Sequence, residues 1–249
     1  MAPINAVGEQ RIEDYWVYLG NELLGVFHPG NIMPVLGDGN HELAFYPGVR
    51  ANGMRDDGII YPFLEAYRTQ VQLCGCSAKD TIFPEFKYKP ATKFSFTANF
   101  DPDNSFLVDY DKDDQTSMKV QSDSVFNGTG AGQLTVTKDN PLNFVGTSSY
   151  YNDFESNSLE VYLEINYKGS AFFQIGLDFI NSNIYSTPQT LINLYPSAEW
   201  KKVYISLASL TNNAGKNDGC RLLLNAYYNS NDPLTTQNIF VDNIKLVHF

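Results

Sequence analysis

The chain has 249 residues, a formal net charge of −11 and 18% charged residues. This length suits one large or two modest domains and allows a buried core without disulfide staples. The excess of acid argues against nucleic-acid binding, which needs clustered Lys and Arg. No stretch approaches the roughly 18 apolar residues of a membrane span. The first ten residues also lack the basic start and apolar centre of a signal peptide.

Strands dominate the predicted secondary structure. The chain contains 16 Tyr and 17 Phe, and its apolar segments are rich in Val, Ile and Thr, which favour strands. Helical periodicity is nearly absent, and short alternating runs are punctuated by Gly, Asn, Asp and Pro. We therefore predict an all-β protein.

The first part of the chain, residues 1–88, is predicted to form a small β-sandwich of five or six strands. Residues 15–27 ("YWVYLGNELLGVF") alternate like a hairpin, with Gly20–Asn21 as its turn. Residues 37–48 and 58–73 predict further strands. A stretch with two prolines and three lysines, residues 84–94 ("PEFKYKPATKF"), predicts the linker.

The second part, residues 89–249, alternates more regularly. Apolar side chains occupy every second position in five segments, which are 158–168, 171–180, 200–207, 221–228 and 238–249. About eight strands over roughly 155 residues, each with one apolar face, predict an antiparallel jelly-roll β-sandwich.

Catalytic motifs are missing from the sequence. The three histidines have no metal-ligand spacing, and neither HExxH nor G-x-S-x-G occurs. The Gly-rich stretch 127–133 ("NGTGAGQ") lacks the Lys-Ser/Thr of a phosphate loop and predicts a turn between strands. No two of the 28 acids stand out as a glycosidase pair. The sequence therefore predicts a protein that is not an enzyme.

Cys74, Cys76 and Cys220 are interpreted as structural residues. Cys74 and Cys76 face the same side of an extended segment, so a bridge between them would strain the chain. The "CGC" stretch is a weak metal signal and does not predict a disulfide framework.

The last twelve residues, "NIFVDNIKLVHF", raise a question about one acid. Read with a two-residue period, one row carries Phe240, Asp242, Ile244 and Leu246. A carboxylate on an inward row is costly unless it is paired. Its possible partners are an Arg or Lys, backbone amides, or a metal ion.

Two interpretations of Asp242 stay open at this point. In a jelly roll the final strand commonly lies beside the first, here residues 92–101, which would bring Asp242 close to Asp101. With the nearby turn at 128–132, these groups predict a calcium site, because Ca²⁺ takes six to eight oxygen ligands. Alternatively, a β-bulge near Asn243 turns Asp242 outward, as a plain hydrogen-bonded acid.

Three stretches, "GAGQLTV" (130–136), "AEWKKVYISL" (198–207) and "FVDNIKLV" (240–247), resemble the galactose-binding-like jelly rolls of carbohydrate-binding modules. The resemblance covers residues 94–249. It implies that an early acid and the acid of the last strand hold a structural calcium, and Asp101 and Asp242 occupy the matching positions. The early acid is often Glu in that superfamily, so Asp101 departs from the pattern.

The whole chain also resembles a group of secreted lipoproteins of Bacteroidetes, through residues 17–27, 32–54 and 61–67. The resemblance implies an extracytoplasmic protein, anchored at the outer-membrane surface or in the periplasm through a lipid-bearing cysteine near the start. This chain has no such cysteine, which fits a sequence trimmed after the anchor. The group implies a fold and a location more clearly than an activity.

Sugars stack on aromatic rings and hydrogen-bond to amides and charged groups. The outward rows of the second part hold such groups, and the predicted ligand-binding residues are Tyr162, Asn166, Tyr204, Arg221, Asn225 and Tyr227. Alternatively, these rings cover the sheet or dock the first domain. The loop 149–157, with Tyr150, Tyr151 and Phe154, is a second candidate surface. Trp16 and Trp200 are interpreted as packed residues.

These observations favour a non-catalytic surface protein that binds glycan through the jelly roll. The competing hypothesis is a structural or adhesive subunit whose partner is another protein. A glycoside hydrolase is the third and weakest hypothesis, because it needs two carboxylates roughly 5–10 Å apart in a cleft.

Overall fold

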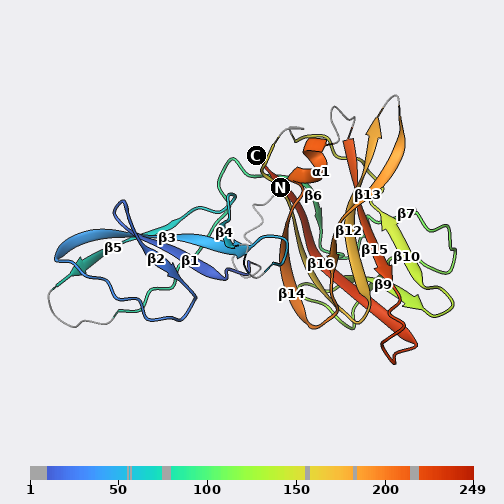
Figure 1. The fold of residues 1–249 in the computed structure, drawn as a ribbon, viewed down its shortest axis with the longest axis horizontal. Helices are drawn as coiled ribbons and strands as arrows, with labels where there is room; N and C mark the ends of the chain where they lie inside the picture. The colour runs from blue at the N-terminus through green and yellow to red at the C-terminus, as the bar shows by residue number, and fades with distance from the viewer. Residues whose placement is uncertain are drawn as a thin grey trace. The chain divides into compact units, whose positions relative to one another are not determined.

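The computed structural model describes residues 10–54, 56, 58–74, 80–154, 158–181, 184–213 and 219–249. The chain divides into two compact units, residues 1–92 (unit 1) and 93–249 (unit 2), with the division four residues beyond the boundary predicted from sequence. The described residues form sixteen strands and one short helix, α1 (Ala208–Asn213). The all-β prediction is therefore confirmed (Figure 1).

Unit 1 contains one five-stranded antiparallel sheet in its described residues. Its strands are β1 (Asp14–Leu19), β2 (Glu22–Phe27), β3 (Gly39–Arg50), β4 (Gly58–Ile60) and β5 (Tyr67–Leu73). The predicted hairpin is present, because β1 and β2 pair across a turn at Gly20, whose positive φ of 57° suits glycine. The predicted sandwich of two sheets is not formed here, because β4 and β5 both pair with the long strand β3, at its opposite ends.

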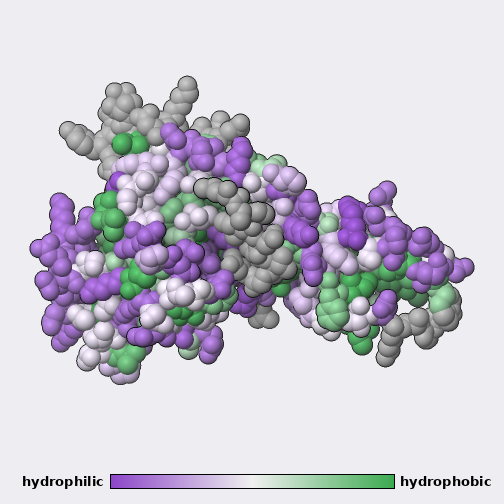
Figure 2. Space-filling view, turned by 180° about the vertical axis from the view of Figure 1, so that it is seen from behind, coloured by the Kyte–Doolittle hydropathy of each residue, from purple (hydrophilic) through white to green (hydrophobic). Residues whose placement is uncertain are grey.

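The unit-1 sheet has one apolar face. Val17, Leu43 and Phe45 lie on it and are buried, and Phe86 packs against the neighbouring Tyr15 ring at 5.9 Å between centroids. The other face carries polar and aromatic side chains, and its β5 residues are exposed at every second position. Seen from behind, the surface of this unit mixes hydrophobic with polar side chains (Figure 2).

Unit 2 is built from two antiparallel sheets. The six-stranded one, here called the β16 sheet, consists of β14 (Ser197–Ser206), β11 (Val161–Gly169), β16 (Thr236–His248), β9 (Ala131–Thr137), β8 (Lys119–Gln121) and β6 (Lys93–Ala98). The five-stranded one, here called the β15 sheet, consists of β13 (Ile184–Leu194), β12 (Phe172–Asn181), β15 (Gly219–Tyr227), β10 (Leu142–Gly146) and β7 (Val108–Asp109). One core cluster, with Leu163, Ile175 and Leu224 fully buried, draws side chains from both sheets. The predicted jelly-roll sandwich thus describes unit 2.

The last strand departs from the two-residue period. Ile239 and Val241 belong to the core, and so do Ile244 and Leu246, which requires one extra residue between the two pairs. That residue lies at a β-bulge where Asn243 has a φ of +46° and the register with β11 shifts. The bulge interpretation is therefore confirmed, and Asp242 lies on the outer side of the β16 sheet. The expected neighbour relation also holds, because β16 pairs with the first strand of unit 2, β6.

The cysteines differ in part from the prediction. Cys74 is disulfide-bonded, which corrects the expectation of an unbridged residue, and Cys76 lies outside the described residues. The expectation relied on an extended strand through Cys74, whereas β5 ends one residue earlier, at Leu73. Cys220 is free and fully buried, and burial raises the pKa of its thiol to about 12, which suits a structural role. No helix among the described residues has the length and hydrophobicity to cross a membrane.

Candidate functional site

The outer face of the β15 sheet combines polar side chains with aromatic rings, and it is here called the β15 face. Strand alternation builds it: Phe173, Ile175 and Leu177 of β12 enter the core, so Gln174 and Asp178 point outward. On the neighbouring strand Asn225 lies opposite Gln174, and Arg221 lies opposite Asp178. The face therefore has an amide row and, four residues along, a charged row.

The charged row centres on Asp178, which is fully buried. Its carboxylate accepts hydrogen bonds from the hydroxyls of Tyr110 and Tyr150, the latter at 3.4 Å. The Arg221 guanidinium stacks over the Tyr150 ring at 4.2 Å from its centroid and donates to the Tyr110 hydroxyl at 3.3 Å. Burial, followed by the hydrogen bond to Asp178, raises the pKa of Tyr110 above its ordinary value. Tyr110 therefore remains a neutral donor at physiological pH.

The amide row is held by a chain of hydrogen bonds. Asn225 donates from Nδ2 to the Tyr227 hydroxyl at 2.6 Å, and that hydroxyl donates to Oε1 of Gln174. Gln174 in turn donates to Oδ1 of Asn193 at 2.6 Å. Because each side chain fixes the next, the row is preorganised for a ligand.

Two polar atoms of the β15 face have no protein partner within the described residues. They are Oδ1 of Asn225 and Nε of Arg221. Asn225 is only 6% exposed. A buried polar atom without a partner costs about 1–3 kcal/mol. One acceptor and one donor of this face thus lack a protein partner, and both are covered by neighbouring atoms.

Aromatic rings flank these polar groups. Tyr110 and Phe144 lie 5.0 Å apart between centroids, and Phe172 meets Tyr195 at 5.9 Å. Tyr195 is 73% exposed. A ligand with flat apolar surfaces and many hydroxyl groups would find both kinds of contact on this face.

The structure divides the six predicted ligand-binding residues between two sheets. Arg221, Asn225 and Tyr227 all lie on β15 and belong to the β15 face. Tyr162, Asn166 and Tyr204 lie on β11 and β14, on the outer side of the β16 sheet, where their exposures are 8%, 1% and 2%. The expectation of one shared platform is corrected, because alternation shows which side of a strand a residue takes and not which sheet the strand joins.

Other residues of the face escaped sequence reasoning. Tyr110 follows a two-residue strand in an acidic stretch, and Phe144 lies on a five-residue strand, so neither had a local signal. The loop with Tyr150, Tyr151 and Phe154 was expected to form a surface. Only Tyr150 joins the β15 face, while the other two rings pack against the core.

The outer side of the β16 sheet holds a buried ion pair. Lys202 Nζ lies 2.8 Å from Oε2 of Glu164, with side-chain exposures of 2% and 0%. The Lys202 ammonium also lies 5.6 Å from the centroid of the Tyr204 ring. Tyr204, one of the predicted ligand-binding residues, is thus in contact with Lys202, whereas Oδ1 of Asn166 has no hydrogen-bond partner within the described residues.

The predicted metal residues, Asp101 and Asp242, converge on one loop. Oδ2 of Asp242 accepts the backbone N–H groups of Phe126 and Asn127 at 3.1 Å each, and Oδ1 accepts that of Asn243 at 2.7 Å. Oδ1 of Asp101 accepts both the backbone N–H and the hydroxyl of Thr129 at 2.7 Å. The two carboxylates therefore fasten residues 126–129 to the sheet.

This arrangement supplies part of a calcium ligand set. The charge of Asp101 adds to burial in raising the pKa of Asp242, so the two acids are close enough to repel. No group of three or more His, Cys, Asp or Glu side chains that could hold a metal ion occurs in the described part of the chain. Loop carbonyls or water would have to supply the remaining oxygens. Calcium at this place stays a prediction.

The test of the calcium prediction is thermal melting with calcium and with EDTA. We expect calcium to raise the melting temperature of the parent chain by several degrees, because binding to the folded state stabilises it. Asp242→Asn keeps the size of the side chain but removes its charge, and should abolish the rise. Asp139→Asn, at an exposed acid elsewhere in unit 2, should retain it. Equal melting of the parent in calcium and EDTA contradicts the prediction.

Comparisons with known proteins give similarities of fold. No protein-family model matches the chain, and neither does any curated protein. Among solved structures, a family 30 carbohydrate-binding module is 17% identical, with 53% of this chain and 73% of that chain covered and a TM-score of 0.42. The family 30 module of a cellulosomal cellulase of Clostridium thermocellum is 15% identical, with 64% and 94% covered and a TM-score of 0.42. A xylan-binding domain of family 22 is 9% identical, with 64% and 96% covered and a TM-score of 0.41.

Proposed function

We propose that unit 2 binds a glycan through the β15 face and does not alter it chemically. One observation carries the proposal: aromatic rings surround a preorganised polar row in which Asn225 Oδ1 and Arg221 Nε lack a protein partner. Sugar hydroxyls can donate to the first and accept from the second once the side chains that cover these atoms move aside, while the sugar's CH faces stack on the rings. The central acid, Asp178, is fully buried and bonded to two tyrosine hydroxyls, so the proposal assigns it no catalytic part.

The proposed location of the protein is outside the cytoplasm. The disulfide at Cys74 supports this, because disulfides persist in oxidising compartments and are rare in the cytosol. A surface or periplasmic protein that holds glycan agrees with such a location. The lipid anchor remains an expectation from the resemblance described above.

Removing either ligand-facing group should weaken glycan binding. We expect Asn225→Ala and Arg221→Ala each to raise the dissociation constant by about tenfold, since one hydrogen bond contributes about 1–1.5 kcal/mol. The measurement is isothermal titration calorimetry with soluble xylan, β-glucan and mannan, using whichever of them the parent binds.

The control is Tyr204→Phe, which removes a hydroxyl from the β16 sheet and should leave the affinity unchanged. Thermal melting of each variant shows whether the fold is kept. Full affinity in both folded β15 variants, or failure of the parent to bind any of the three polysaccharides, contradicts the proposal. Release of new reducing ends from a bound polysaccharide would contradict the non-catalytic assignment.

A further inference from the structure

A second surface with aromatic rings and polar groups lies on unit 1, on the side of the sheet opposite its apolar face. It is here called the unit-1 open face. Trp16 and Tyr18 of β1 reach it, because the intervening Val17 belongs to the core. Tyr46 of β3 lies opposite Trp16, and Arg68 of β5 lies opposite the small Ala44. None of these residues was predicted to bind a ligand, and Trp16 was expected to be packed.

The rings of this face are held in place by their neighbours. Tyr18 and Tyr46 contact each other edge to face, with 5.2 Å between centroids. The Arg68 guanidinium lies 5.8 Å from the Tyr46 centroid and donates to its hydroxyl at 2.9 Å. A rigid aromatic surface binds a ligand with little loss of side-chain entropy.

Trp16 lies close to Gly48 of the neighbouring strand β3. A Cβ added to Gly48, which faces Trp16 from the neighbouring strand, would come within 3.3 Å of the indole Cδ1 and 3.0 Å of Asp14 Cβ. The Cδ1 edge of the indole therefore lies close to Gly48, where a side chain would crowd it. Trp16 is half-buried, and its indole Nε1 is buried without a hydrogen-bond partner in the described residues.

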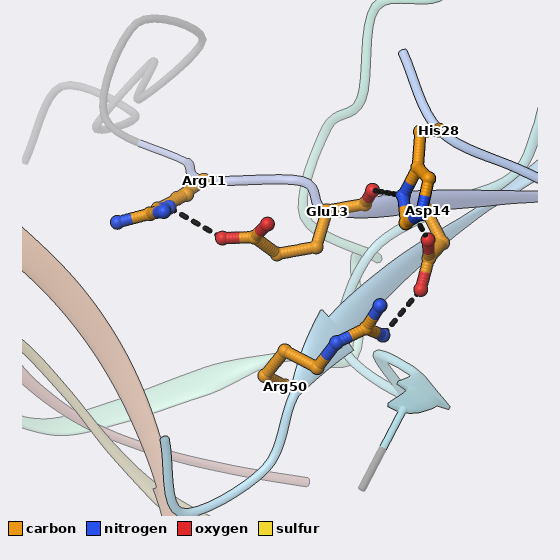
Figure 3. A network of polar contacts seen from close by, with 5 residues as sticks. All are labelled: Arg11, Glu13, Asp14, His28 and Arg50. Carbon is orange, nitrogen blue, oxygen red and sulfur yellow. Dashed lines mark hydrogen bonds and ion pairs between the residues drawn. The ribbon is translucent and has the colours of Figure 1, made fainter. Parts of the chain in front are cut away.

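The charges of the unit-1 open face cancel in pairs. Arg68 pairs with Glu42 at 2.5 Å, with side-chain exposures of 49% and 38%. At the other end Arg50 pairs with the buried Asp14, which also lies 2.7 Å from Nδ1 of His28 (Figure 3). Each of these two arginines thus pairs with an acid, and in the described part of unit 1 they leave no surplus of positive charge on this face for an anionic ligand.

A neutral, hydroxylated ligand fits this face better than a protein. Covering the exposed Arg68–Glu42 pair with a protein surface would remove its water, which costs free energy unless every bond is replaced. Sugar hydroxyls can take the place of that water bond by bond. Gln70 and Gln72, exposed on the same side of β5, add amide donors and acceptors.

We infer that the unit-1 open face is a second carbohydrate-contacting surface, which stacks a neutral sugar on Trp16 and the Tyr18–Tyr46 pair. This goes beyond the binding proposed for unit 2, because it makes the chain bivalent. Two separate contacts raise the overall affinity for one polysaccharide when it engages both at once.

The chain's two tryptophans make a direct test available. In a Trp200→Phe chain, Trp16 is the only indole, and its fluorescence reports on unit 1. We expect neutral xylo-, gluco- or manno-hexasaccharide to change this emission in a saturable way. Tyr46→Ala should weaken the response at least fivefold, and Tyr18→Ala serves as a second variant if the first fails to fold. Phe83→Ala removes an 81% exposed ring of unit 1 that lies outside the face, and should leave the response unchanged.

The same titration separates this inference from the function proposed for unit 2. Adding Arg221→Ala and Asn225→Ala to the Trp200→Phe chain should leave the Trp16 response in place. A response that disappears with these changes would overturn the inference, because Trp16 would then be reporting on the β15 face. No response to any hexasaccharide, while calorimetry shows binding at unit 2, would overturn it and leave the proposed function standing. Self-association that Tyr46→Ala abolishes, seen by light scattering without any sugar response, would assign the face to a protein partner instead.

Discussion

Replacing Glu164 by leucine is expected to lower the free energy of unfolding of unit 2 by about 3–5 kcal/mol, because it leaves the buried Lys202 ammonium without its counter-charge. Lys202→Met should cost less, because the buried Lys245 lies opposite Glu164 on β16 and leaves the carboxylate a cationic neighbour. The 2.8 Å separation and the near-complete burial of both side chains place this pair among those for which truncation is most costly. Urea unfolding, followed by the fluorescence of Trp200 on β14, measures the free energy of unfolding of unit 2, which contains the ion pair.

The double variant Glu164→Leu/Lys202→Met distinguishes a charge effect from a packing effect. It should recover part of the loss, since apolar side chains can replace the pair at little cost, while Lys245 opposite position 164 loses its neighbouring carboxylate. The exposed Arg68–Glu42 pair of unit 1 is the control. Glu42→Leu should lower the free energy of unfolding of unit 1, followed by the fluorescence of Trp16, by less than about 1 kcal/mol. Single variants that cost no more than this control, or a double variant as unstable as the sum of the singles, would contradict the assignment.

Acidification from pH 7 to about pH 4 is expected to stabilise unit 2 through Asp242. Burial raises the pKa of Asp242 to about 6 in the folded chain, against about 3.9 in the unfolded chain. Above pH 6 both states are ionised, and the folded state bears the cost of the buried charge. As the pH falls from 6 towards 4 the folded carboxyl takes up a proton first, so the folded state gains up to about 3 kcal/mol, which a rise in pH removes again.

The measurement is the free energy of unfolding of unit 2 between pH 4 and pH 7, in EDTA so that no metal contributes. Asp242→Asn removes this titrating group and should reduce the slope of this part of the profile. Hydrogen bonds from Thr129 lower the pKa of Asp101, so that acid affects stability only at lower pH. Burial raises the pKa of Asp111 as well, so the difference between the parent and Asp242→Asn profiles is what measures Asp242. Parallel profiles for the parent and Asp242→Asn would show that another group is responsible.

In β11, β12, β14 and β15 the inward and outward sides were predictable from the sequence, but the neighbours of these strands were not. Alternation correctly placed Leu163 and Ile165 in the core of unit 2 and Asn166 on its outer side. The chain then crosses from the β16 sheet to the β15 sheet just after Gly169, so residues on β11 and β15 face opposite ways. Which sheet receives a strand depends on contacts distant in sequence, and a period of two contains no information about them.

The predictions for Asp242 and Trp16 were wrong for different reasons. For Asp242, the two-residue period was continued across a β-bulge, where it does not hold. The only local sign of the bulge in the sequence was Asn243, a residue type that tolerates a positive φ. At Trp16 both rows of the strand are apolar, with Trp16 and Tyr18 on one and Tyr15, Val17 and Leu19 on the other. Alternation could not decide which row faced the core. The open face of unit 1 was hidden for that reason.

The central place of β16 constrains how the protein is made. This strand is the last of unit 2 to be synthesised, yet it pairs with β6 and β9 along one side and with β11 along the other. Until it emerges from the ribosome those three strands keep unpaired edges, which favour aggregation. Unit 1, complete by residue 92, can fold while the ribosome is still adding unit 2. A nascent chain stalled before residue 236 would therefore carry a folded first unit and an open, chaperone-dependent second one.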